Sequence, residues 1–234
     1  MEDVGTLAAM VRPVAMSASR TVGLAGALAG LFPEGGLQRG STVVVRAGGG
    51  GVSLALALAA AASSGGWVAA AGLPSLGLVA AAEMGARLER LALVPAPGER
   101  WPVVAAALLD GVDLLLLGVA GGALGRVRAG DARRLGARAR ERGAVLMVLE
   151  APGPGWGEWP EPGDVRLRVA GGEWNGLGVG HGRLRSRRVE VAVTGRRAAA
   201  RERRFALLLP GQEGEPVAVA EPPQVDLPAQ VLAG

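Results

Sequence analysis

The chain has 234 residues, 50% of them hydrophobic, and a formal net charge of +4, which suits one folded core with short tails. It contains no cysteine and no tyrosine, its only histidine is His181, and all 25 basic residues are arginine. These counts exclude disulfides, thiolate metal sites and any chemistry that needs a lysine, such as a Schiff base.

Up to Glu150, short apolar runs alternate with segments of helical spacing. The apolar runs predict buried strands at residues 43–46, 67–74, 91–98, 112–120 and 144–150. The intervening segments predict helices at residues 53–62, 77–88, 101–109 and 131–143. Strands that alternate with helices across short loops predict an α/β fold with a mainly parallel central sheet flanked by helices.

The pattern changes after Glu150. Residues 151–164 are rich in proline and glycine, and the runs VRLRVAGG, RVEVAVTG and RFALLLPG then alternate like antiparallel strands. From Gly211 the chain is rich in proline, glutamine and acid, a composition typical of disorder. We therefore expect an N-terminal arm (residues 1–23), a core with C-terminal antiparallel strands (24–210) and a disordered tail (211–234).

The chain shows no sign of membrane targeting. A spanning helix needs roughly 20 apolar residues in succession, and the apolar run from Leu54 is ended by two serines and two glycines. The first ten residues also lack the basic start and apolar stretch of a signal peptide. We expect a cytoplasmic protein without membrane contact.

The run VVVRAGGGGVSLALALAA, from Val43, has the layout of a phosphate-binding loop between a strand and a helix. Such loops follow the pattern GxxxxGK[ST], in which the lysine reaches the phosphates and the hydroxyl holds Mg²⁺. Here Arg46 stands at the first glycine and Val52 at the lysine. The second glycine and the hydroxyl are kept, so the vestigial loop comprises Gly48, Gly49, Gly50, Gly51 and Ser53.

The carboxylate that supports the metal is also missing. It belongs at the end of a later strand, where this chain has Gly118 in the run LLLLGVA. Each charge-assisted hydrogen bond contributes roughly 1.5–3 kcal/mol, so losing both lysine and aspartate removes most nucleotide affinity. The sequence predicts a structural turn with no nucleotide cofactor, no metal and no catalytic residue, although backbone amides could still hold an anion weakly.

Several motifs together resemble the RecA recombinase core. GGLQRGSTVVV, the glycine loop, WVAAAGLP, ALLDGVDLLLLGVA and RVEVAVTGRRAAARERRFALLLPG occur in its order and spacing, over residues 24–211. The resemblance implies a RecA-like fold and places the catalytic glutamate near Pro74 and two ATP-contacting lysines near Val193 and Gly195. None of these residues is kept, and the chain is too short for the C-terminal domain of RecA.

A shortened RecA core of this kind is similar to the ImuA family, in its actinobacterial-type branch. The matching phrases are GLPSLGLVAAAEMGARLERLALVPAPG and WNGLGVGHGRLRSRRVEV. The resemblance implies an accessory role in damage-induced mutagenesis, beside an ImuB-type relative of Y-family polymerases and an error-prone replicative-type polymerase. We therefore expect a non-enzymatic adaptor of translesion synthesis. Its oligomeric state stays open between a monomer, a dimer and a small ring.

A basic strip occupies residues 183–204. Nine arginines stand against Glu190 and Glu202, a formal balance of +7. The strip suits a phosphate backbone or an acidic partner, although a solvated strand edge would look the same. Its members, the candidate partner or DNA contacts, are Arg183, Arg185, Arg187, Arg188, Arg196, Arg197, Arg201, Arg203 and Arg204.

Three smaller features carry weaker signals. WNGLGVGHG (residues 174–182) predicts a glycine-rich hairpin or loop, and its His181 has no partner cluster that would make it catalytic. Trp156 and Trp159 in the proline loop favour a hydrophobic lid over a partner anchor. QVDLP (residues 224–228) partly matches a sliding-clamp pentapeptide but lacks its final aromatic residue.

Two other functions compete with the adaptor. A DNA-binding module acting through the basic strip would bind with a salt dependence that is lost when those arginines are mutated. An ATPase with rewired residues would show turnover that depends on Ser53. The adaptor itself requires that the chain be recovered with the polymerase-like partner.

Overall fold

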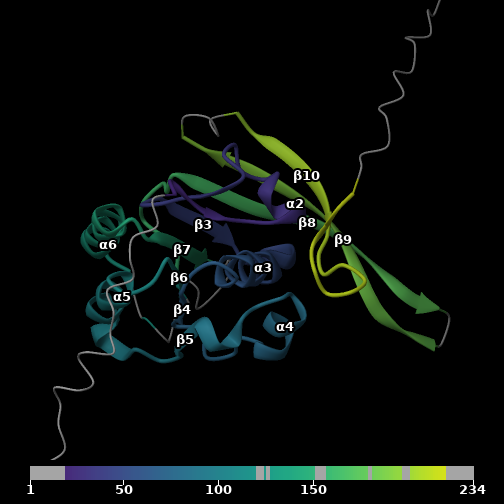
Figure 1. The fold of residues 1–234 in the computed structure, drawn as a ribbon, viewed down its shortest axis with the longest axis horizontal. Coiled ribbons are helices and arrows are strands. Elements are labelled where there is room, and N and C mark those ends of the chain that lie inside the picture. Colours follow the sequence, from purple (N-terminus) through teal and green to yellow (C-terminus); the bar gives the residue numbers. More distant parts are fainter. Residues whose placement is uncertain are drawn as a thin grey trace, which may run out of the picture.

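The computed structural model describes residues 19–119, 124, 127–150, 157–178, 181–196 and 201–219. These residues form one nine-stranded mixed sheet in the order β11-β10-β9-β8-β3-β7-β6-β4-β5, and a separate two-stranded sheet, β1-β2. Figure 1 shows the large sheet running through the molecule, with helices packed against it. The fold is thus α/β with a large mixed sheet, as the sequence predicts.

The parallel part of the sheet contains the apolar strands that the sequence indicates. In chain order these are β3 (Thr42–Arg46), β4 (Val68–Ala71), β5 (Leu91–Val94), β6 (Leu114–Gly118) and β7 (Val145–Glu150). β4, β6 and β7 are buried throughout, because helices cover both faces of this part of the sheet.

The C-terminal part is largely antiparallel and extends well beyond the helices. It consists of β8 (Val165–Gly178), β9 (His181–Gly195), β10 (Arg203–Leu208) and β11 (Val217–Ala218). β9 pairs antiparallel with β8 and with β10. The expected antiparallel C-terminal strands are confirmed, and β8 also joins them to the parallel part of the sheet by pairing parallel with β3. Alternation along a strand reports which face is buried, and it carries no information on strand direction.

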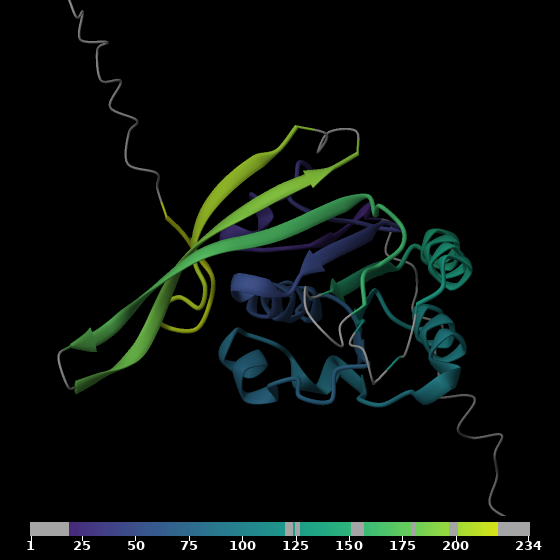
Figure 2. The ribbon, with the colours of Figure 1, turned by 180° about the vertical axis from the view of Figure 1, so that it is seen from behind.

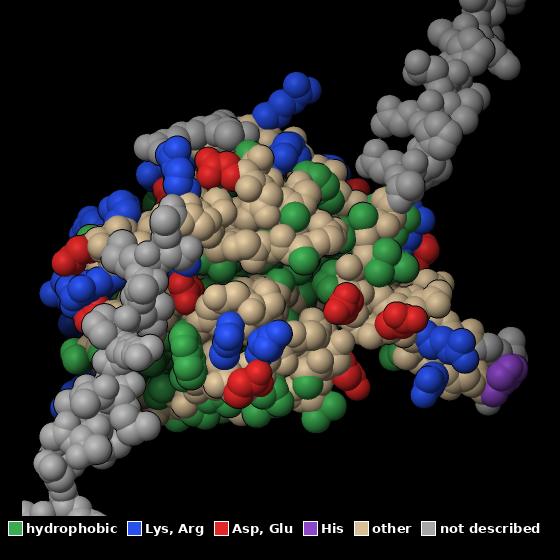
Figure 3. Space-filling view, in the orientation of Figure 1, with side chains coloured by type: hydrophobic (Ala, Val, Ile, Leu, Met, Phe, Trp, Pro, Cys, Tyr) green, Lys and Arg blue, Asp and Glu red, His purple; other side chains and the backbone are tan. Residues whose placement is uncertain are grey.

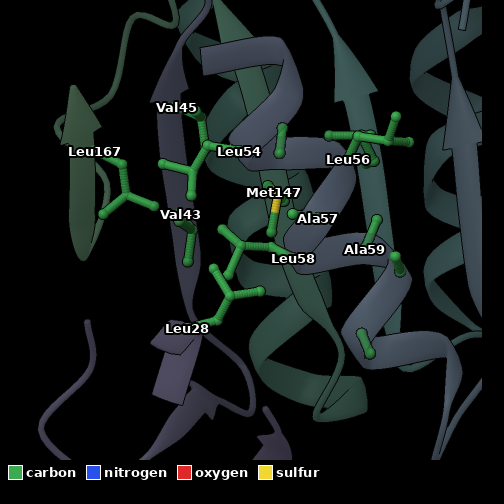
Figure 4. Close-up of a cluster of buried hydrophobic side chains, with 14 of the residues drawn as sticks. Leu28, Val43, Val45, Leu54, Leu56, Ala57, Leu58, Ala59, Met147 and Leu167 are labelled. Atoms are coloured by element: carbon green, nitrogen blue, oxygen red, sulfur yellow. The ribbon is translucent and has the colours of Figure 1, made fainter. Parts of the chain in front are cut away.

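The helices lie in two layers. α2 (Gly26–Ala29), α3 (Gly51–Ser63) and α4 (Leu78–Glu83) pack on one face, where α3 meets Val43 and Val45 of β3. Figure 4 shows this cluster, with Leu54 and Leu58 of α3 close to those valines and Leu167 of β8 beside them. α5 (Trp101–Leu109) and α6 (Ala129–Arg142) cover the opposite face, around Val44, Leu146 and Val148.

The helix expected over residues 77–88 is shorter than predicted. α4 ends at Glu83, and a 3-10 turn, η2 (Leu88–Arg90), follows separately. Gly85 has φ +87°, the left-handed conformation that commonly terminates helices at glycine. The apolar periodicity continues past this residue, so it predicts a longer helix than the backbone allows.

Both ends of the described chain add short strands. β1 (Thr21–Gly23), within the segment expected as an arm, pairs with β2 (Gly36–Gln38), and Val22 is buried in the core. β11, within the segment expected as a tail, pairs with the end of β10. Among the described residues, no helix combines the length and apolar character that a bilayer crossing requires.

Buried carboxylates hold the two edges of the parallel sheet. At the amino edge, Asp113 accepts hydrogen bonds from Arg39 Nη2 at 2.7 Å and from the Trp67 amide at 2.9 Å. At the carboxyl edge, Glu150 accepts them from Arg166 Nη1 at 3.0 Å and from the Trp159 amide at 2.9 Å. Each buried carboxylate therefore has a charged partner, which is what makes its burial tolerable.

Candidate functional site

The glycine loop lies at the carboxyl end of β3, in the middle of the sheet. β3 ends at Arg46, the 3-10 turn η1 spans Gly48–Gly50, and α3 begins at Gly51. Gly49 has φ +65° and Gly50 φ +116°, values that side chains other than glycine rarely adopt. Open α/β sheets generally bind ligands at the carboxyl ends of their central strands, so the loop occupies the position where a nucleotide site is expected.

The loop is packed closely against its surroundings. A Cβ atom on Gly49 would lie 2.6 Å from the carbonyl oxygen of Val169 in β8, and one on Gly51 would lie 1.8 Å from that of Arg46. A Cβ atom on Gly50 would lie 3.1 Å from Nη1 of Arg187. The glycines are therefore needed for contact between the loop, β3 and the C-terminal strands, whether or not any phosphate binds.

The residues at the lysine and hydroxyl positions open the first turn of α3. The Val52 side chain is 42% exposed, and Ser53 is half-buried. A groove of about 200 Å³ borders the loop at Gly48, and its charged lining is Arg46, Arg168, Glu190 and Arg204. Each of these arginines has a carboxylate within 4 Å, so the positive charge of this groove is already largely balanced.

The position of the metal-supporting carboxylate is filled by apolar packing. Gly118 is the last residue of β6, and a Cβ atom there would lie 2.2 Å from Cδ2 of Leu73 and 2.8 Å from the carbonyl oxygen of Gly72. An aspartate does not fit unless Leu73 moves. Pro74, at the position of the RecA glutamate, is exposed. Among the described residues, no three of His, Cys, Asp and Glu gather as a metal-binding group.

Glu150 is the charged residue near the loop that sequence reasoning missed. It ends β7 beside Arg46 of β3, is 2% exposed, and binds Arg166 and, at 3.6 Å, Arg46. It also accepts the Trp159 amide, so it joins β3, β7, β8 and the loop before β8. The available signal was a lone glutamate at the end of an apolar strand, a residue type that is rarely buried without a partner.

The nine arginines of the basic strip do not form one surface. Arg203 and Arg204 lie on opposite faces of β10, Arg196 and Arg201 lie beyond the strand ends, and Arg197 falls outside the described residues. Arg183 and Arg185 lie in the part of β9 that extends past β10, whereas Arg188 pairs with Leu208 of β10 and Arg187 bonds to the residues that follow it. Adjacent positions in a strand point to opposite faces, which a count along the sequence cannot register.

The strip residues near the body of the sheet are paired. Arg204 contacts Glu202 at 2.9 Å and Glu190 at 3.0 Å. The hydrogen bond that Arg204 donates to Glu202, with the charge of Glu190, raises the pKa of Arg204 above its usual value. Arg203 donates from Nη2 to the Leu31 carbonyl at 2.8 Å and lies over the ring of Phe205. These two arginines stabilise β10 in its place.

The strip residues farther out are different. Arg183, Arg185 and Arg188 are exposed, and no carboxylate of the described residues lies within 4.0 Å of their guanidinium groups. Arg187 is half-buried: its guanidinium lies 5.5 Å from the ring centre of Trp174 and donates from Nη2 to the Gly171 carbonyl at 3.3 Å. Arg187 thus connects the outer strands to the glycine loop, while the others face solvent.

The remaining sequence candidates lie apart from the loop. Val193, at one RecA lysine position, is buried between β8 and β10, and Gly195 ends β9. His181 is exposed at the far end of β9. The Trp159 side chain is buried in the core with α5 and α6. Trp156 and residues 224–228 fall outside the described residues.

Comparison with known proteins places this chain in a family. The model of the MT3502 N-terminal domain matches residues 30–161, which is more than half of the chain. The chain belongs to the MT3502 family. The matched residues contain β3, the glycine loop and Gly118, and they end before β8 begins.

One relative of this chain is the uncharacterized protein Rv3395c of Mycobacterium tuberculosis. It is 45% identical over 97 residues, which cover 42% of this chain and 43% of the relative. The aligned part is therefore less than half of the relative's length, and its name states no activity.

Proposed function

We propose that this protein is a non-catalytic, RecA-like accessory protein of a mutagenic translesion synthesis complex. In that complex it acts as an adaptor that docks on an ImuB-type relative of Y-family polymerases, together with an error-prone replicative-type polymerase. The motif resemblance to the ImuA family motivates this role, and the protein is expected to work in the cytoplasm.

The centre of the sheet supports a RecA-like core. The unit of β3, glycine loop and α3 lies between β7 and β8, with parallel strands on both sides. Motifs that resemble RecA in sequence therefore form consecutive, adjoining parts of one sheet. The loop also keeps its position at the carboxyl edge, where a RecA-type nucleotide site would lie.

The packing at Gly118 is the observation that most favours a non-catalytic role. Phosphoryl transfer relies on a lysine and on a metal held by a hydroxyl and a carboxylate, acting together. Here Val52 replaces the lysine, and Leu73 fills the space of the carboxylate next to Gly118. A single substitution cannot repair this arrangement, whereas the sheet itself is complete. Such a combination favours a retained binding surface over a retained reaction.

Co-purification tests the adaptor role directly. The full chain, carrying an affinity tag, is expressed with the ImuB-type protein of the same genome, and the mixture is separated by size-exclusion chromatography. The two proteins are expected to elute together, earlier than either alone. A tagged chain with Gly65→Ala, a change in open space, serves as a matched positive control. Separate elution of the two proteins would contradict the proposal.

A turnover measurement tests the competing enzyme. Phosphate release from Mg-ATP is expected to stay at the level of the buffer blank for the wild-type chain and for Ser53→Ala. Release that exceeds the blank and disappears in Ser53→Ala would show that a rewired ATPase is present.

A further inference from the structure

The outer halves of β8 and β9 form a two-stranded ribbon, residues 170–178 and 181–188, that projects from the molecule. β8 leaves β3 after Arg168, and β9 pairs with β10 only from Arg188 onward. Figures 1 and 2 show the ribbon extending beyond the helices in both views. Two register shifts, at Ala170/Glu173 and at Asn175/Leu177, bend it away from the sheet.

The root of the ribbon is fixed to the body. The Leu209 amide donates to the Arg187 carbonyl at 2.7 Å, and the Arg187 amide donates to the Pro210 carbonyl at 3.1 Å. The Arg187 side chain packs on Trp174 in the opposite strand and approaches Gly50. An isolated two-stranded ribbon is only marginally stable, so this anchoring gives the projecting strands a defined direction.

Positive charge outweighs negative charge on the ribbon. It contains four arginines and one acidic residue, Glu173. No carboxylate of the described residues lies within 4.0 Å of the guanidinium groups of Arg183, Arg185 or Arg188, whereas Arg204 in the body has two such partners. Figure 3 shows basic side chains gathered on the ribbon, next to the single histidine.

Arg183 and Arg185 lie close together on the ribbon. They fall in the second register shift, where residues 183–185 of β9 stand opposite Gly176 of β8 alone, and both are exposed. Guanidinium groups bind phosphate oxygens through paired hydrogen bonds. Arg183 and Arg185, both exposed, are therefore suited to phosphate contacts.

We infer that this ribbon enters the major groove of duplex DNA and that Arg183 and Arg185 contact the phosphates along it. The groove is about 12 Å wide and admits a two-stranded ribbon. Phosphate contacts position a protein without reading sequence, so the binding is sequence-independent.

The same residues argue against other nucleic acids. Binding of single strands relies on aromatic rings that stack on bases, and the one aromatic residue of the ribbon, Trp174, has Arg187 over its ring. Duplex RNA has a deep and narrow major groove that protein elements do not enter. Duplex DNA is thus the ligand that the ribbon fits.

Fluorescence anisotropy with a labelled, mixed-sequence 20-base-pair DNA, between 50 and 200 mM NaCl, tests this inference. The double variant Arg183→Ala/Arg185→Ala is expected to bind about tenfold more weakly at 50 mM salt. Its plot of log affinity against log salt is expected to be shallower by about 2, or about 1 for each phosphate contact removed. Arg183→Gln/Arg185→Gln, which keeps the side-chain length, is expected to behave alike.

The matched control is Arg87→Ala/Arg133→Ala, which removes the same charge from exposed positions outside the ribbon. It is expected to keep the wild-type slope. The inference would be overturned by an equal loss of DNA affinity in both double variants, or by no binding of the duplex at 50 mM salt. Equal binding of single-stranded DNA or duplex RNA would also overturn it.

This inference is independent of the adaptor role, and the two can fail separately. The ribbon variant is expected to lose DNA while it still elutes with the ImuB-type protein. A ribbon variant that keeps DNA binding and no longer elutes with that protein would make the ribbon a protein-docking element and would also overturn the inference.

Discussion

The glycine loop and the ribbon both stand out in the sequence, and they differ in how far the rest of the protein contacts them and balances their charge. The loop is packed against Val169 and Arg46 through Gly49 and Gly51, and the nearby arginines pair with carboxylates. The ribbon is exposed, and its outer arginines have no carboxylate partner among the described residues. A loop with the pattern of a phosphate site can thus serve packing, while the positive charge open to a ligand lies on the ribbon.

Replacing a loop glycine is expected to have the largest effect on folding. In Gly51→Ala the new Cβ atom would overlap the Arg46 carbonyl, 1.8 Å away, so we expect the free energy of unfolding to fall by about 4 kcal/mol. Urea denaturation measures this change. Gly65→Ala, where no atom lies within 4 Å, is the control, and an equal stability of the two variants would contradict the packed loop.

Restoring the missing carboxylate is expected to destabilise the protein without creating activity. Gly118→Asp forces the side chain into Leu73 and buries a charge, which costs about 3 kcal/mol. Thermal unfolding compares it with Gly111→Asp, placed in open space. Combined with Val52→Lys, it should still release no phosphate from ATP. A stable, active double variant would show that the site is only dormant.

Removing the buried carboxylate at the carboxyl ends of the strands is expected to lower the free energy of unfolding somewhat less than Gly118→Asp does. Glu150→Ala leaves the Arg166 guanidinium and the Trp159 amide without their acceptor, a loss of about 2–3 kcal/mol in the free energy of unfolding. Glu158→Ala removes a glutamate that is 81% exposed and 3.8 Å from Arg46. Denaturant midpoints for the pair should differ clearly, and similar midpoints would mean that Glu150 does not hold this edge.

The surface ion pairs of Asp110 are expected to make a small contribution to stability that depends on pH. The hydrogen bond from Arg138, together with the charges of Arg138 and Arg142, holds the pKa of Asp110 below its usual 3.8. The stabilisation is therefore complete above about pH 4 and is lost as the pH falls through the lowered pKa. Asp110→Asn should cost less than about 1 kcal/mol at pH 7.

Urea midpoints of the wild type and Asp110→Asn, measured at pH 7 and at successively lower pH, follow this difference. The gap between the two proteins should close in acid, with Glu89→Gln as the control for an exposed carboxylate. A gap that widens as the pH falls would contradict the assigned direction.

The ribbon should contribute least to stability. Arg183→Ala/Arg185→Ala removes two exposed side chains without carboxylate partners among the described residues, so the free energy of unfolding should change by less than about 0.5 kcal/mol. Arg166→Ala, which strips a partner from buried Glu150, is the contrasting variant. A ribbon variant as unstable as Arg166→Ala would mean that the ribbon arginines are structural.

Sequence patterns anticipate the parallel part of the sheet well, because buried strands between helices have a strong apolar signature. They fail where backbone geometry decides. Gly85 ends α4 within a continuing apolar pattern, and β8 pairs parallel with β3 on one side while it pairs antiparallel with β9 on the other. Neither the turn nor the strand direction changes the spacing of apolar residues.

The candidate site was predictable in its residues but not in its contacts. The sequence identifies the replaced lysine position at Val52, yet only packing reveals that Leu73 fills the space beside Gly118. The sequence shows nine arginines as one strip. In the structure Arg204 pairs with carboxylates, and Arg183 and Arg185 have no such partner among the described residues. The role of Glu150 depends on Arg166, sixteen residues later in the chain, and no local pattern connects them.

The most direct test of a non-catalytic adaptor is the affinity of the full chain for the ImuB-type protein, titrated with and without Mg-ATP. A binding site that has lost its lysine and carboxylate has no differential interaction with nucleotide that could shift complex formation. The dissociation constant is therefore expected to agree within about twofold in the two conditions. A tenfold or greater tightening by Mg-ATP, abolished by Ser53→Ala, would contradict the adaptor and reinstate a working nucleotide site.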